Sequence, residues 1–301
     1  MVPSIQGQRR EAQVRRHLPG GGRGPEPPPA RSGEGPVRRR EAHADQGSPD
    51  SRVRADLLEE LQRGGGRENA RRGAGIADRA IGSVAAIVAA GGRGERARGS
   101  TLKQFQQLGG RPLVEWSLDV LASSGCNPMV LVVPPESLDG IGSALGHRCT
   151  VVAGGDSRQQ SVRNGLQHVT SDYVVVHDAA RPFVTSEMIE RTLSSLEDAE
   201  GAIVATPLDE TLKRVDGDVV DETVSRAHLW RVQTPQSFRT EALREAHDKA
   251  EAAGIEATDD ASLVERNGGR VVVVHSTRAN MKLTYPEDFV IAEAILGSHK
   301  K

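Results

Sequence analysis

Cysteine, aromatic residues and long apolar runs are all scarce in this sequence of 301 residues. The two cysteines, Cys126 and Cys149, stand alone without a C-x-x-C spacing, which argues against a disulfide framework and against a structural zinc site. The chain has neither a run of about 20 apolar residues, as a membrane-spanning helix requires, nor the apolar region of a secretory signal peptide. These absences favour a reducing compartment, and we expect no membrane association and a cytoplasmic location.

Aromatic residues are missing altogether from residues 1–80, and the first one in the chain is Phe105. The same segment carries 16 Arg against 11 acidic residues, a net charge of +5, together with 13 Gly and 8 Pro. Such a composition cannot bury enough apolar surface to offset the entropy of the chain, so we expect a disordered leader. Its acidic residues argue against a transit peptide. A transit peptide in this segment would instead imply that the protein is located in a plastid. The other interpretation is translated GC-rich DNA upstream of the true start.

Lysine is the rarest of the charged residues, with six against 33 arginines. The first lysine is Lys103, which comes just after a glycine-rich stretch. Residues 81–301 carry a net charge of −7, which argues against a nucleic-acid partner. Because lysine is so rare in this chain, we expect the ammonium group of Lys103 to contact a ligand rather than to lie in solvent.

From residue 81 onward, short apolar, β-branched runs alternate with longer amphipathic stretches. This alternation predicts one α/β domain over 81–301, a Rossmann-like open sheet, mostly parallel, with helices on both faces. The predicted strands are 83–90, 128–133, 149–153, 172–178, 201–207 and 270–276. The predicted helices are 112–124, 157–169, 185–198, 240–253, 259–267 and 286–296.

In open α/β sheets, ligands bind beyond the carboxyl ends of the strands, and the first predicted strand runs into a glycine-rich loop with Gly91, Gly92 and Gly94. Such a loop can bring backbone N–H groups close to a phosphate. A dinucleotide fingerprint fails because the acidic residue that should follow is missing, and a Walker loop fails because Ser100 stands where lysine is needed. A tight turn without a ligand stays an alternative.

Polar side chains also follow the strand at 172–178. His177, Asp178 and Arg181 come at its end, and a carboxylate there suits a ligand of Mg²⁺ or of the substrate. A structural Asp178–Arg181 pair is the competing interpretation. In a third segment, Asp156 follows two glycines and Ser157 can cap the next helix, whose free amides could pair with a base edge. That segment could equally be a well-capped helix and nothing more, and 258–265 reads as another capped helix start.

Taken together, these motifs resemble those of the 2-C-methyl-D-erythritol 4-phosphate cytidylyltransferase family. The resemblance covers roughly residues 83–297. It rests on AGGRGER followed by KQ, VAGGDSRQQSVRNGL, HDAARP, PLDETLKRV, TVSRAHLWRVQTPQSF, TDDASLVE and NMKLTYPEDF. The chain departs from the family pattern where prolines usually stand, with Val88 or Ala89 before the glycine loop and Leu102 before Lys103. These departures bear on loop geometry more than on chemistry.

The resemblance implies transfer of CMP from CTP to 2-C-methyl-D-erythritol 4-phosphate, with Mg²⁺ as cofactor and pyrophosphate as the second product, in non-mevalonate isoprenoid synthesis. It implies these catalytic residues: Arg96, Lys103 and Lys282. The residues implied to bind CTP are Ala90, Gly91, Gly92, Gly155, Asp156 and Ser161. The residues implied to bind the phosphopolyol substrate are Asp178, Thr211, Arg226 and Thr234, with Asp178 also at the metal.

The resemblance further implies a homodimer, joined by a protruding arm at about 207–228 that carries Thr211 and Arg226 to a neighbouring subunit. From the residues alone, a solvated hairpin is as good an interpretation of this charged segment. Three other functions stay open: a ribitol-5-phosphate cytidylyltransferase, a non-catalytic nucleotide-binding module, and a dinucleotide-dependent oxidoreductase, which the missing acidic residue disfavours.

Overall fold

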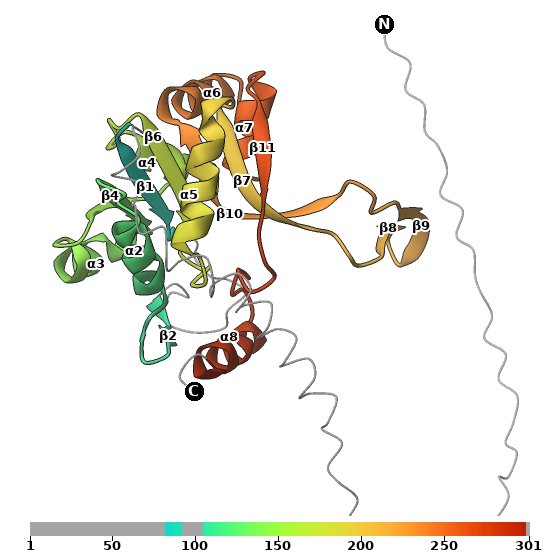
Figure 1. Cartoon of the computed structure of the whole chain (residues 1–301), viewed down its shortest axis with the longest axis horizontal. Coiled ribbons are helices and arrows are strands. Elements are labelled where there is room, and N and C mark those ends of the chain that lie inside the picture. The colour runs from blue at the N-terminus through green and yellow to red at the C-terminus, as the bar shows by residue number, and fades with distance from the viewer. Residues whose placement is uncertain (1–81, 92–104, 299–301) are drawn as a thin grey trace, which may run out of the picture. The chain divides into compact units, whose positions relative to one another are not determined.

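The computed structural model describes residues 82–91 and 105–298. Their core is a seven-stranded sheet of order β11-β7-β10-β6-β1-β4-β5 (Figure 1). Its strands are β1 (Val84–Ala89), β4 (Met129–Val133), β5 (Thr150–Ala153), β6 (Tyr173–Asp178), β7 (Gly201–Pro207), β10 (Trp230–Arg239) and β11 (Val271–His275). All neighbours pair in parallel except β10, which runs antiparallel to β6 and β7. The predicted mostly parallel α/β sheet is confirmed, and the predicted leader lies outside the described residues.

Helices connect the strands, and each of the six predicted helices is present. The helices are α2 (Leu113–Ser123), α3 (Leu138–Leu145), α4 (Arg158–Leu166), α5 (Ser186–Ser194), α6 (Thr240–Ala252), α7 (Asp260–Arg266) and α8 (Pro286–Ser298), with short 3-10 turns η3 (Pro135–Ser137) and η4 (Ser195–Glu197). Three begin with a side-chain cap, in which Ser157, Thr185 or Asp259 accepts a hydrogen bond from a backbone N–H of the first turn. The sequence did not predict α3.

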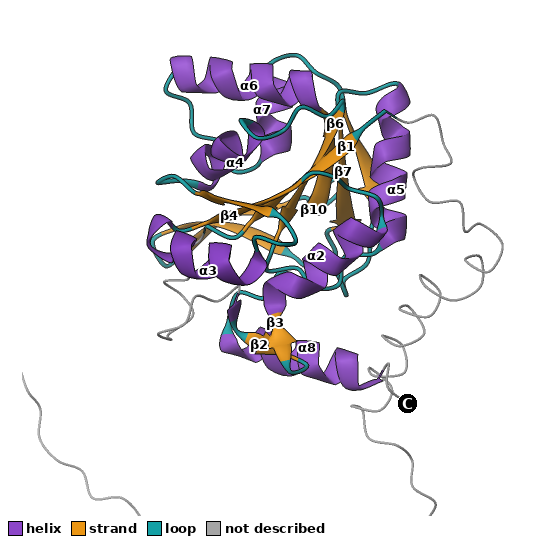
Figure 2. Ribbon diagram, turned by 90° about the vertical axis from the view of Figure 1, so that its left-hand side faces the viewer, coloured by secondary structure: helices purple, strands orange, loops and turns teal. Residues whose placement is uncertain are grey.

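The continuous apolar runs of the central strands reflect burial on both faces of the sheet. In β1, Ala86 and Val88 pack with α2 and α5, whereas Ala85 and Ile87 pack with α4, α6 and α7. Figure 2 shows the helices in these two layers, on opposite sides of the sheet. Because both faces are covered, ligands can approach the central strands only at their ends.

A smaller apolar cluster lies beside the sheet, where α8 packs against the hairpin of β2 (Gln107–Leu108) and β3 (Arg111–Pro112). Leu283 is fully buried in this cluster, and its backbone N–H donates to the carbonyl of Ala180 at 2.8 Å. The loop from β11 to α8 is therefore fastened to the turn that follows β6.

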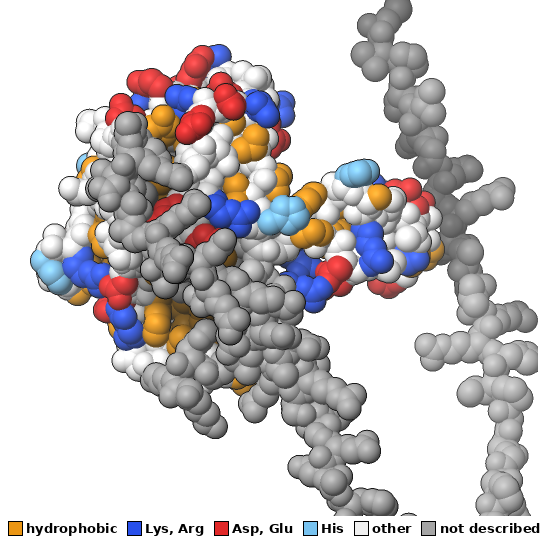
Figure 3. All heavy atoms as spheres, viewed as in Figure 1, with side chains coloured by type: hydrophobic (Ala, Val, Ile, Leu, Met, Phe, Trp, Pro, Cys, Tyr) orange, Lys and Arg blue, Asp and Glu red, His pale blue; other side chains and the backbone are white. Residues whose placement is uncertain are grey.

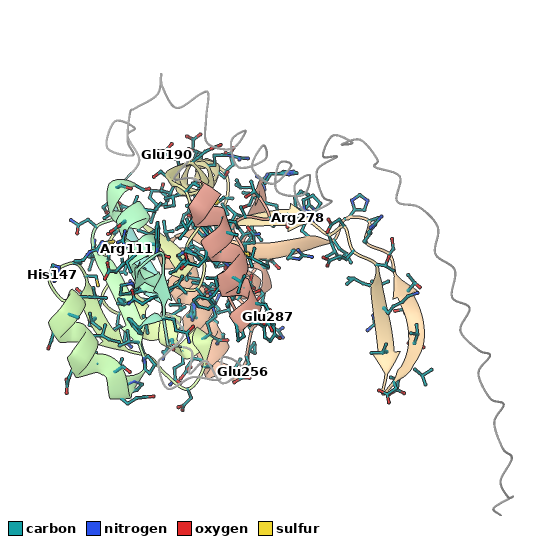
Figure 4. All side chains as sticks on the ribbon, turned by 90° about the horizontal axis from the view of Figure 1, so that it is seen from below. Arg111, His147, Glu190, Glu256, Arg278 and Glu287 are labelled. Carbon is teal, nitrogen blue, oxygen red and sulfur yellow. The ribbon has the colours of Figure 1, made fainter. Side chains whose placement is uncertain are left out.

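A second hairpin, β8 (Leu212–Asp216) and β9 (Val219–Val224), forms a two-stranded sheet of its own within the predicted arm. It lies away from the main sheet at the end of the ribbons that continue β7 and β10 (Figure 1). Apolar side chains gather where the hairpin joins the sheet (Figure 3), and Leu229 and Val232 are exposed there. Arg278, labelled in Figure 4, pairs with Asp209 at the same place.

Over the residues that the structure describes, none of the helices has the length and apolar character needed to cross a membrane.

Candidate functional site

Asp178 lies at the carboxyl end of β6, beside the end of β1, because Ala89 is its partner in the parallel ladder. The Asp178 side chain is 9% exposed and three cations surround it. Lys282 Nζ lies 2.8 Å from Oδ2, Arg158 Nε 3.2 Å from Oδ1, and Arg181 Nε 3.9 Å from Oδ2. Burial would raise the pKa of Asp178, but these charges outweigh it and hold the pKa well below its usual range. The Asp178 carboxylate is therefore ionised at neutral pH.

The amide of Asp178 is fixed by its neighbours on β6 and β10. Its N–H donates to Thr234 Oγ1 at 3.0 Å, and Thr234 Oγ1 lies 3.1 Å from His177 Nδ1. His177 Nε2 faces the carbonyl of Arg181 at 3.1 Å, so Nε2 carries the proton and Nδ1 accepts from the Thr234 hydroxyl. Burial lowers the pKa of His177 to about 4, which keeps this neutral form. Thr234 thus orients Asp178.

Arg158 connects Asp178 to a second buried carboxylate, Asp260, which is 1% exposed. Arg158 Nη1 lies 2.7 Å from Asp260 Oδ2, and His247 Nε2 lies 3.1 Å from Asp260 Oδ1. Burial would raise the pKa of Asp260, but the charge of Arg158 together with the interactions from His247 and the Arg158 hydrogen bond outweighs it, and the pKa is lowered. The first turn of α4 is therefore tied to the first turn of α7 through a buried ion pair.

Ser161 of α4 joins two loops at the carboxyl ends of the strands. Its Oγ accepts from the N–H of Gly155 at 3.1 Å. A Cβ at Gly91 would lie 3.1 Å from the same oxygen, and a Cβ at Gly154 only 2.8 Å from it. Glycine is therefore needed for the loop after β1 to approach the loop after β5 so closely. The exposed Asp156 follows, with its N–H bonded to Gln160 Oε1 at 2.8 Å.

The structure brings together one part of the set of residues predicted from the sequence. Around the ends of β1, β5 and β6 lie Ala90, Gly91, Gly155, Asp156, Ser161, Asp178, Thr234 and Lys282. Gly92, Arg96 and Lys103 lie outside the described residues. Thr211 and Arg226 flank the β8–β9 hairpin and are exposed, and Arg226 donates to the carbonyl of Asp209.

The structural pair of Asp178 and Arg181 that the sequence offered as the competing interpretation is present in the structure. Arg181 pairs with Asp178, and its Nη1 also donates to the carbonyl of Asn280 at 2.9 Å. Three residues of the network around Asp178 were not predicted: Arg158, which contacts it, Asp260, which pairs with Arg158, and Asn280, whose side chain bonds to the Thr234 carbonyl. The only sequence signal for Arg158 was its place in the first turn after a glycine pair, and the signal for Asp260 was read as a helix cap.

Within residues 82–91 and 105–298, no three His, Cys, Asp or Glu side chains gather in a way that could hold a metal ion. The single carboxylate of Asp178 still fits Mg²⁺, because this ion often takes one or two protein carboxylates and completes its shell with phosphate oxygens and water. The cluster thus offers one anionic ligand and several cations for a polyphosphate, an arrangement suited to stabilising charge at phosphorus.

The comparisons with known proteins all match the same family. A family described as 2-C-methyl-D-erythritol 4-phosphate cytidylyltransferase matches residues 84–298. The curated protein of that name from Geobacillus thermodenitrificans is 45% identical over 221 residues, which cover 71% of this chain and 96% of that protein. The one from Halalkalibacterium halodurans is 39% identical over 222 residues, or 71% and 97%. The crystal structure of the enzyme of that name from Thermus thermophilus superposes with a TM-score of 0.62 at 34% identity, covering 71% of this chain and 99% of that one.

Proposed function

The chain belongs to the 2-C-methyl-D-erythritol 4-phosphate cytidylyltransferase family, and from that premise we propose that the cluster around Asp178 is its catalytic site. The enzyme transfers CMP from CTP to 2-C-methyl-D-erythritol 4-phosphate in the non-mevalonate route to isoprenoids. A phosphate oxygen of the acceptor attacks the α-phosphorus of CTP, the bond to the β-phosphate oxygen breaks, and pyrophosphate leaves. The attacking phosphate is already ionised at neutral pH, so the protein need not supply a general base.

Catalysis then depends on position and charge. Lys282 reaches the Asp178 carboxylate at the end of the sheet, where its ammonium group would meet the phosphates of CTP. Arg96 and Lys103 would supply further cations from the glycine-rich loop. The Asp178 carboxylate and the triphosphate would together hold Mg²⁺. When bound, this ion neutralises charge on the phosphates.

The cytosine and ribose of CTP would lie over the loops joined by Ser161. Ala90, Gly91 and Gly92 would line one side of the nucleotide, and Gly155 and Asp156 the other. Support comes from the close approach of Gly91 to Ser161 and from the first turn of α4 at this edge, where Ser157 caps the N–H of Gln160 and the two preceding N–H groups have no partner within the helix. Thr234 would line the acceptor pocket with its backbone, since its hydroxyl already serves Asp178 and His177.

We propose that the β8–β9 hairpin joins two copies of the chain and carries Thr211 and Arg226 to the phosphopolyol site of the neighbouring subunit. The support is the hairpin's own exposure: Val215 is 57%, Val219 71% and Val220 53% exposed on an element with its own small sheet. Solvent-exposed valines at this density favour a protein partner.

The observation that carries the proposal is the Lys282–Asp178 contact at the end of β6. It is tested by measuring pyrophosphate release from CTP and Mg²⁺ with methylerythritol 4-phosphate, with ribitol 5-phosphate, and with no acceptor. We expect release with the first acceptor alone. Lys282→Met should lose most of the turnover, whereas Lys249→Met, which removes an exposed lysine of α6, should retain it. Wild-type turnover in Lys282→Met would remove Lys282 from the site, and faster release with ribitol 5-phosphate would change the acceptor.

A further inference from the structure

We propose that Asn280 is a positioning residue that holds the ammonium group of Lys282 at Asp178. This inference rests on the proposed function, because it gives Asn280 a role that acts through Lys282. Asn280 does not touch Asp178 in the structure. It lies two residues before Lys282 in the loop between β11 and α8, and its side chain faces β10.

The side chain of Asn280 is completely buried in a loop whose neighbouring Lys282 is 45% exposed. Its Nδ2 donates to Gln233 Oε1 at 3.0 Å and to the carbonyl of Thr234 at 2.9 Å. A buried amide needs such partners, and here both lie on the segment of β10 where the register with β7 shifts. Asn280 therefore fastens the Lys282 loop to the strand that orients Asp178.

Two backbone contacts complete the attachment on either side of Lys282. Before it, the carbonyl of Asn280 accepts from Arg181 Nη1 at 2.9 Å. After it, the N–H of Leu283 donates to the carbonyl of Ala180 at 2.8 Å. The backbone of Lys282 is thus held on both sides against the turn after β6, although its own side chain is long and partly in water.

Asparagine suits this place because both acceptors that it faces are fixed. The carbonyl of Thr234 cannot donate, and Gln233 is kept in one orientation because its Nε2 donates to the carbonyl of Thr277 at 3.1 Å. Alanine at 280 would remove both hydrogen bonds. Aspartate at 280, although equal in size, would set oxygen against oxygen.

A double-mutant cycle on the full-length enzyme tests the inference, with Asn280→Ala, Lys282→Met and the combination of both. We expect Asn280→Ala to lower kcat and kcat/KM together by about tenfold to a hundredfold, the loss typical of a displaced catalytic group. In the Lys282→Met background the same substitution should change either constant by less than about twofold, because the group it positions is gone.

Thr192→Val is the matched control. Thr192 is also completely buried, and its Oγ1 is bonded to Ser237 Oγ at 2.7 Å on the α5 side of β10, so the variant loses a comparable contact elsewhere. We expect near wild-type kcat in this variant, and unchanged amide hydrogen exchange over residues 279–285. The same segment should exchange faster in Asn280→Ala.

The outcomes separate the two proposals. Wild-type kcat in Asn280→Ala, or an equal loss in both backgrounds, would overturn the role of Asn280 and leave that of Lys282 intact. Wild-type kcat in Lys282→Met would overturn both. Should Asn280→Ala fail to fold, Asn280→Ser, which retains one donor, takes its place in the same cycle.

Discussion

Replacing Asp260 with asparagine should destabilise the fold far more than the same replacement at its neighbour Asp259. Asp260 is 1% exposed, and its two oxygens are held by Arg158 at 2.7 Å and by His247 at 3.1 Å. Removal of one member of a buried ion pair costs about 3–5 kcal/mol, because the other charge is left uncompensated. The Arg158 side chain is 28% exposed and keeps its contact with Asp178, so the lower end of this range applies.

The expected loss of about 3 kcal/mol corresponds to a fall in Tm of roughly 6–12 °C for a domain of this size. Asp259→Asn should cost about 1 kcal/mol or less, because asparagine also caps a helix by accepting from the N–H of Ser262. The buried Gln236 amide, whose Nε2 donates to Asp259 Oδ2 at 2.9 Å, can turn so that its oxygen accepts from the amide introduced at position 259. Urea unfolding followed by circular dichroism at pH 7 measures both variants under equal conditions.

The pH dependence gives a second check on the same ion pair. Because the pKa of Asp260 is lowered on folding, its contribution is complete above the unfolded value of about 4 and is lost as the pH falls through the lower folded value. The difference in unfolding free energy between wild type and Asp260→Asn should therefore be constant from about pH 5 to about pH 8 and shrink below about pH 4. Equal stability of Asp259→Asn and Asp260→Asn at pH 7 would refute the reasoning.

Three further predictions concern the nucleotide loops, the core and the thiols. Ser161→Ala removes the hydrogen bond to the N–H of Gly155, worth about 1 kcal/mol, so steady-state kinetics should give a KM for CTP raised roughly fivefold; an unchanged KM would contradict this. Gly165→Ala sets a Cβ 2.9 Å from Ile87 Cγ2, and the overpacking outweighs the better helix propensity, so urea unfolding should register a net loss of about 1 kcal/mol rather than a gain. Burial raises the pKa of the Cys126 thiol to about 12, so a disulfide reagent at pH 8 should label this thiol only after unfolding, and fast labelling of the native enzyme would show that it is accessible.

The sequence predicted well those strands whose burial on both faces leaves a continuous run of apolar residues. The six predicted strands are recovered to within one residue at each end, because β-branched runs covered on both faces have an unmistakable pattern. β10 has no such run, since Trp230–Arg239 contains polar residues throughout, and its pattern did not predict a strand. α3 escaped prediction because its eight residues include two glycines and follow two prolines.

At the site, the prediction selected residues by their place at a strand end, such as Asp178, or by a glycine pair, such as Gly155. The structure brings these two residues to the same edge of the sheet, and their roles stay predictions. It was incomplete where a side chain acts on a residue remote in the chain. The pairing of Arg158 with Asp260 joins residues 102 positions apart, and nothing in either local pattern reveals it. The place of Thr234 at the substrate stays a prediction, and the hydrogen bond of its hydroxyl to the backbone N–H of Asp178 was not foreseen from the sequence.

The irregular register of β10 has a consequence for how sequences of this kind can vary. Between Val232 and Gln236 the strand leaves the ladder of β7, and in this stretch the carbonyl of Thr234 accepts from Asn280 Nδ2 while the hydroxyl of Thr234 accepts from the N–H of Asp178. An inserted residue in this stretch would turn every later side chain to the opposite face. Length changes at the tip of the outlying hairpin, between β8 and β9, would in contrast leave every hydrogen bond around Asp178 in place. Diversification among homologues should therefore concentrate at that tip and spare the stretch from Val232 to Gln236.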